Sequence, residues 1–176
     1  MIEVSSVVCN LACAHRLMNH KGKCAHIHGH NFYVTFSISA PSDLFLEKDT
    51  NILYDFHHLK KRGLWIEQQY DHRILLNKHD EAWIKSMNAL CPGDVVLFDG
   101  DPTSEALAIK ILTSLYGELS APFIYLAMSR KAESMQKMAD QVLCTVTVEE
   151  TKGCEARASK YLGAWLREEE GHNVQD

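Results

Sequence analysis

Residues 28–39 read HGHNFYVTFSIS, and this stretch decides the fold class. Apolar and polar side chains alternate over residues 30–39, so that four large apolar residues point to one side: Phe32, Val34, Phe36 and Ile38. A period of two predicts a β-strand with one buried face, as antiparallel sheets have. The segment Pro41-Ser42-Asp43 ends the strand.

Other patterns extend this strand into an architecture. Mixed apolar and small residues over 2–14 and a second alternation over 142–150 predict two more strands, and a short apolar run at 95–98 is a candidate strand. Apolar residues with helical spacing over 55–70 and 104–115 predict two helices. Strand pairs with helices between them are typical of an α+β domain whose helices cover one face of the sheet. The open edge strands of such a sheet need covering, which oligomerisation can supply.

Composition limits the class of protein. The chain has 176 residues and a formal net charge of −5, so we expect one globular domain over 1–176 and no nucleic-acid partner. We find no signal peptide, no membrane-length apolar run and no tight cysteine pairing, which favours a cytoplasmic protein without disulfides. Residues 118–141 look like an insertion and 167–176 like a solvated tail.

Histidines gather near the N-terminus: of ten in the chain, five fall between residues 15 and 30. His28 and His30 share a strand face, and His15 comes near them if the two strands form a hairpin. Three imidazoles suit Zn²⁺ and leave a fourth position open, which is the catalytic pattern. The alternative is a histidine pair satisfied by backbone hydrogen bonds. We interpret His20 and His26 as facing solvent.

Two further motifs offer acid–base groups. Cys24 lies four residues before His28, and a nearby cation favours a thiolate that can act as a general base. The alternatives for Cys24 are a fourth zinc ligand or an inert thiol. In Asp71-His72 a carboxylate stands beside an imidazole whose basicity it can tune.

Glu150 is an acid in an apolar context. The parity of its strand places it on the same face as Val146 and Val148, where a carboxylate needs a partner. A bound heterocycle with two N–H donors would provide one. A register break near the strand end would instead return Glu150 to solvent.

The order of these motifs resembles the 6-pyruvoyl-tetrahydropterin synthase and 6-carboxy-tetrahydropterin synthase family. The pieces that match run from residue 14 to 151: Ala14-His15-Arg16-Leu17, Lys23-Cys24, His28-Gly29-His30-Asn31-Phe32, Tyr54-Asp55-Phe56 with Leu59-Lys60, Asp71-His72 with Leu76-Asn77, Pro102-Thr103-Ser104-Glu105 with Leu107-Ala108, and Val148 through Glu150-Thr151. Residues 78–100 and 118–141 look longer than usual for the family.

The resemblance implies a tunnelling fold (T-fold): a four-stranded antiparallel sheet with two helices on one face, assembled into homo-oligomers, commonly hexamers, with sites between subunits. It also implies a role for each motif residue. Zinc is bound by His15, His28 and His30; Cys24 is the catalytic base with Asp71 and His72 relaying protons; Glu150 anchors the pterin ring, with Glu105 and Thr103 lining its pocket.

The resemblance further implies 7,8-dihydroneopterin triphosphate as substrate. Three residues separate Cys24 from His28, a short loop that looks like the queuosine-pathway branch. The expected products are then 6-carboxy-5,6,7,8-tetrahydropterin, acetaldehyde and triphosphate. The alternatives are the 6-pyruvoyl product, a non-catalytic metal- or pterin-binding protein, and a structural zinc module with Cys24 as fourth ligand.

Overall fold

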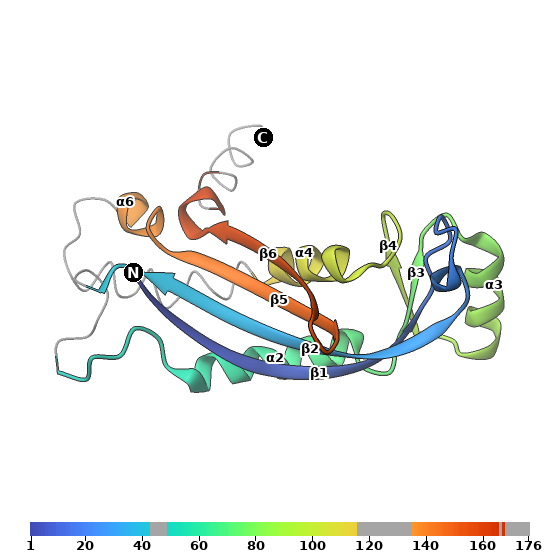
Figure 1. Cartoon of the computed structure of the whole chain (residues 1–176), viewed down its shortest axis with the longest axis horizontal. Helices are drawn as coiled ribbons and strands as arrows, with labels where there is room; N and C mark the ends of the chain where they lie inside the picture. The colour runs from blue at the N-terminus through green and yellow to red at the C-terminus, as the bar shows by residue number, and fades with distance from the viewer. Residues whose placement is uncertain (43–48, 116–134, 166, 168–176) are drawn as a thin grey trace.

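Figure 1 shows the computed structural model, which describes residues 1–42, 49–115, 135–165 and 167. Six strands form one sheet in the order β4-β3-β1-β2-β5-β6. The strands are β1 (Ile2–His15), β2 (His28–Ala40), β3 (Ile74–Asn77), β4 (Val95–Phe98), β5 (Leu143–Thr151) and β6 (Cys154–Tyr161). The helices are the 3-10 helix η1 (Lys23–Ala25), α2 (Phe56–Tyr70), α3 (Glu81–Leu90), α4 (Ser104–Ser114) and α6 (Met135–Ala139).

The predicted strand over 30–39 is confirmed as β2, which begins two residues earlier and lies in the middle of the sheet (Figure 1). Its four large apolar side chains are all buried: Phe32, Val34, Phe36 and Ile38. β1 and β5 flank β2, and both pair with it antiparallel. The register of β1 with β2 places His15 directly opposite His28.

One face of the sheet carries both predicted helices. The buried hydrophobic side chains of α2 and α4 belong to the same hydrophobic core as those of β1, β2 and β5. Burying the apolar stripes of two helices against one sheet face removes them from water together, which stabilises this layered arrangement. The α+β class and its helix placement are therefore confirmed.

The strand count and part of the pairing differ from the prediction. The sheet has six strands rather than four, and β3 pairs parallel with both β1 and β4. β3 and β4 have four residues each, too short to show an alternation, but the candidate strand over 95–98 is confirmed as β4. The segment 78–100, which we expect to be longer than usual, contains α3 and the edge strand β4 of the sheet.

Two other sequence predictions concern residues that the structure mostly does not describe. The predicted insertion over 118–141 is described only from residue 135, where α6 begins, and the predicted tail only at Arg167. None of the helices in the described ranges combines the length and hydrophobicity needed to cross a bilayer.

A glycine allows α2 to pack closely on β1. The β1–β2 register shifts between Val7 and Cys9, and this bulge directs the carbonyl of Val8 at Gly63 in the middle of α2. A Cβ at Gly63 would lie 2.0 Å from the Val8 carbonyl oxygen, inside any permitted contact. The glycine that weakens the helical pattern of 55–70 is therefore required by packing.

We expect Gly63→Ala to lower the free energy of unfolding by about 3 kcal/mol, because the helix must move off the sheet. Urea unfolding at a fixed protein concentration measures this change. Gly100→Ala is the matched control, since a Cβ there meets no atom within 4 Å. Equal stability of the two variants would contradict the packing argument.

Candidate active site

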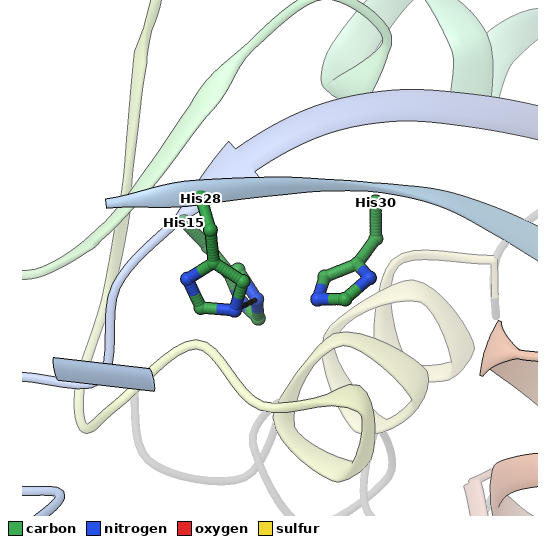
Figure 2. Close-up of side chains that lie close together, drawn as sticks. All are labelled: His15, His28 and His30. Carbon is green, nitrogen blue, oxygen red and sulfur yellow. Dashed lines mark hydrogen bonds between the residues drawn. The ribbon is translucent and has the colours of Figure 1, made fainter. Parts of the chain in front are cut away.

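Three histidines converge at one end of the sheet. His15 is the last residue of β1, whereas His28 and His30 begin β2. Figure 2 shows the three imidazoles pointing to the same side of the sheet. One ligand atom from each ring lies within 4.8 Å of the others, so the group could hold a metal ion.

Backbone carbonyls fix the tautomers of two of these rings. Nδ1 of His15 donates to the carbonyl of Pro102 over 2.8 Å, and Nδ1 of His28 donates to the carbonyl of His26 over 2.8 Å. A neutral imidazole that donates from Nδ1 carries a lone pair on Nε2. Both lone pairs are therefore directed into the cluster, as metal ligation requires.

The spacing of these lone pairs fits a metal ion. Nε2 of His15 and Nε2 of His28 lie 3.1 Å apart, and two neutral rings in these tautomers have no proton to share there. Two nitrogens bound at roughly 2.0–2.1 Å to a tetrahedral Zn²⁺ are about 3.3 Å apart. Burial lowers the pKa of His15, which keeps its imidazole neutral and able to bind a cation. The donor set therefore fits zinc.

Glu150 lies beside the cluster. Its Oε1 is 3.4 Å from Nε2 of both His15 and His30. The β5–β6 register does shift between Glu149 and Thr151, yet the carboxylate still faces the histidines. Its negative charge favours a cation at this place.

A pocket of about 340 Å³ opens next to this centre. It is lined by the four predicted residues Cys24, Thr103, Glu105 and Glu150, together with Leu17, Ser104, Cys154, Glu155 and Ala156. Residues from opposite ends of the chain thus meet in one cavity large enough for a small heterocycle.

The start of α4 forms one wall of this pocket. Thr103 caps the helix, accepting a hydrogen bond from the backbone N–H of Ala106. A hydrogen bond from Thr103 also lowers the pKa of Glu105, which keeps that carboxylate ionised. The predicted carboxylates of Glu105 and Glu150 therefore line the same cavity, which Glu155 also lines.

Cys24 differs from the buried thiols. All six cysteines are free. Burial raises the pKa of Cys9, Cys13 and Cys144 to about 12, so these three stay protonated. Cys24 is half-buried and lines the pocket, where a substrate can reach it.

The predicted pair Asp71 and His72 does not join the pocket within one chain. Oδ1 of Asp71 accepts from the N–H of Ala12, and the N–H of His72 donates to the carbonyl of Ala12. His72 adopts a left-handed backbone (φ 55°), and its side chain is 84% exposed. The Asp71 and His72 side chains are 3.7 Å apart, so the pair exists but faces solvent.

Sequence reasoning missed several parts of the site. The Pro102 carbonyl left no signal, because every residue type offers the same backbone acceptor. Cys154 and Glu155 lie on β6, a strand that the sequence patterns did not predict. Their signals are Gly153, whose φ of +81° marks the hairpin turn, and the small residues Ala156 and Ala158 that alternate after it.

Together, the fold and the site define an α+β protein with a three-histidine cluster that could hold a metal ion, beside a pocket lined by thiols and carboxylates. The family model for 6-pyruvoyl tetrahydropterin synthase matches residues 6–160, and the chain belongs to this family. The match covers every element of the site described above.

Individual relatives carry two different names. The chain is 26% identical over 106 residues to 6-carboxy-5,6,7,8-tetrahydropterin synthase of Rickettsia typhi, covering 60% of this chain and 74% of that protein. The protein of the same name from Rickettsia bellii is 23% identical over the same length, with the same coverage. The crystal structure of 6-pyruvoyl tetrahydropterin synthase from Plasmodium vivax superposes with a TM-score of 0.61 at 20% identity, covering 91% of this chain and 96% of that one. At this identity the superposition establishes the T-fold.

Proposed function

We propose that the protein converts 7,8-dihydroneopterin triphosphate and water into 6-carboxy-5,6,7,8-tetrahydropterin, acetaldehyde and triphosphate, as a zinc-dependent carbon–carbon lyase of queuosine biosynthesis in the cytoplasm. One observation carries the proposal: a single pocket contains a thiol and a carboxylate, and that carboxylate touches a three-histidine centre. The names of the Rickettsia relatives favour the carboxy product.

Each residue type has a distinct task in this proposal. His15, His28 and His30 hold the zinc ion, which when bound polarises the substrate's side-chain hydroxyls. Cys24 accepts a proton from the substrate carbon beside those hydroxyls. Glu150 accepts the two N–H groups of the pterin ring and thereby sets the distance between ring and side chain.

Basic side chains near the pocket receive the triphosphate. Arg16 and Arg73 are unsuitable, because they already pair with Asp80 and Asp94. Lys21 and Lys23 lie on the loop that carries Cys24, and in the described part of the chain neither has an ion-pair partner. We assign the triphosphate to this lysine pair, since a mobile ammonium suits a flexible phosphate chain.

Glu150→Gln is expected to weaken pterin binding about 10- to 100-fold, because a charge-assisted contact becomes a neutral one. The zinc content should stay at one per chain, since three imidazoles remain. Calorimetric titration with a pterin and metal analysis measure the two effects. Glu149→Gln is the control, because that carboxylate bonds the N–H of Gly153 at the hairpin instead. Loss of zinc from Glu150→Gln would contradict the assignment.

In our proposal, Asp71 and His72 take part in the reaction only after the chain assembles into a homo-oligomer, which we expect to be a hexamer. Since the pair faces solvent, we propose that it completes the pocket of a neighbouring copy and relays the protons that Cys24 exchanges.

A mixing experiment tests this arrangement. Cys24→Ala and His72→Ala should each be inactive, but chains mixed and reassembled should regain about a quarter of the activity, because a quarter of sites then receive both intact residues. Unmixed variants treated identically are the control. A reassembled mixture without activity would contradict a shared site.

Product identification tests the function itself. Zinc-loaded protein is incubated with 7,8-dihydroneopterin triphosphate, and the products are identified by mass spectrometry. We expect 6-carboxy-tetrahydropterin with an equal amount of acetaldehyde. The 6-pyruvoyl product without acetaldehyde would assign the second candidate, which the family model and the Plasmodium structure favour. Binding without turnover would indicate a non-catalytic pterin-binding protein.

A further inference from the structure

A carboxylate outside the pocket joins three parts of the site. Asp101 directly precedes Pro102, whose carbonyl accepts the hydrogen bond from Nδ1 of His15. The Asp101 backbone carbonyl accepts from the N–H of Thr103, so a short turn encloses Pro102. The position of Asp101 therefore determines where the Pro102 carbonyl points.

The Asp101 side chain is anchored on the sheet side by Asn77. Nδ2 of Asn77 donates to Oδ1 of Asp101 over 3.0 Å. Asn77 is 3% exposed, and its own Oδ1 accepts from the N–H of His79. This buried amide at the end of β3 is a fixed support, because both of its polar groups are already bonded.

The same carboxylate holds the loop that carries Cys24. Oδ2 of Asp101 accepts from the backbone N–H of Asn19 over 3.0 Å, and Oδ1 accepts from its side-chain amide over 3.2 Å. The loop is closed further along, where the N–H of Leu17 donates to the carbonyl of Cys24 over 2.8 Å. One carboxylate thus links the loop of the proposed base to the turn that orients a metal ligand.

We propose that Asp101 is a positioning residue that couples the zinc centre to the Cys24 loop. The inference rests on the proposed function, in which the histidines bind zinc and Cys24 is the base. Asp101 touches neither group. It acts on His15 through the Pro102 carbonyl and on the loop through Asn19. In many metal sites, residues that do not bind the metal orient the ligands in this way.

Asp101→Asn tests the coupling, because an amide of the same shape cannot accept from all three donors. We expect zinc affinity, measured by competition with a chelating indicator, to fall about 10- to 100-fold. The visible spectrum of the Co²⁺-substituted variant should change, since the ligand geometry changes. Alkylation of Cys24 by iodoacetamide, followed by peptide mass spectrometry, should accelerate as the loop loosens.

Two further variants complete the test. Asp99→Asn is the control, because Asp99 is 96% exposed and pairs with Lys78 at the surface; all three measurements should match wild type. Asn19→Ala removes only the loop contact, so Cys24 alkylation should accelerate while zinc affinity stays within about twofold of wild type. It provides a second test if Asp101→Asn does not fold.

The outcomes separate this inference from the proposed function. Suppose that the wild-type protein binds zinc, and that Asp101→Asn and Asn19→Ala match it in zinc affinity, Co²⁺ spectrum and alkylation rate. The proposed coupling would then be wrong, whereas the proposed zinc site would be supported. If wild type binds no zinc, the proposed function fails, and the coupling with it.

Discussion

His15→Ala and His28→Ala are expected to abolish zinc binding and turnover together. Each change removes one of two Nε2 lone pairs that are held 3.1 Å apart by backbone bonds to Pro102 and His26. Loss of a direct ligand should reduce zinc affinity by more than roughly 10- to 100-fold, which is the reduction typical when a hydrogen-bond partner of a ligand is removed. Metal analysis after dialysis against a weak chelator gives the zinc content per chain.

The histidine variants need a control for general loss of charge or solubility. His57→Ala serves, because His57 lies exposed on α2 and takes no part in the cluster. It should keep one zinc per chain and wild-type turnover. Full zinc content in His15→Ala would show that the ion binds elsewhere, and the proposed centre would be wrong.

Cys24→Ala is expected to reduce kcat by about 10²- to 10⁴-fold, the usual contribution of a general base. The thiol lines the pocket but is not among the grouped metal ligand atoms in the described chain, so zinc content and pterin affinity should be retained. Steady-state kinetics with metal analysis and a binding titration separate these effects.

Cys91→Ala is the matched control for Cys24→Ala. Cys91 is also free and half-buried, but it follows α3 and does not line the pocket. It should behave as wild type. A Cys24→Ala protein with undiminished kcat would remove the thiol from the mechanism and favour a binding role for the pocket.

Much of the site could be predicted from the sequence, because the pairing of consecutive strands and the alternation of side chains along a strand follow from local sequence patterns. Two histidines on one strand face and His15 at the end of the preceding strand predict convergence once β1 and β2 pair. Parity likewise placed Glu150 on the face that the structure shows, despite the register shift near it.

Other features depend on long-range packing that no local pattern records. The parallel pairing of β3 and β4 involves two strands of four residues, and the bulge at Val8 explains Gly63 only after α2 has packed on β1. The motif Asp71-His72 was recognisable, but its exposure within one chain was not, because it follows from the contacts of both residues with Ala12.

Zinc-edge X-ray absorption on the metal-loaded protein tests the central claim most directly, namely that the three histidines form an open, catalytic metal centre. We predict one zinc per chain with only nitrogen and oxygen neighbours at roughly 2.0–2.1 Å: three imidazoles and one exchangeable oxygen. A sulfur neighbour at roughly 2.3 Å would contradict this, because Cys24 would then close the site as a structural ligand.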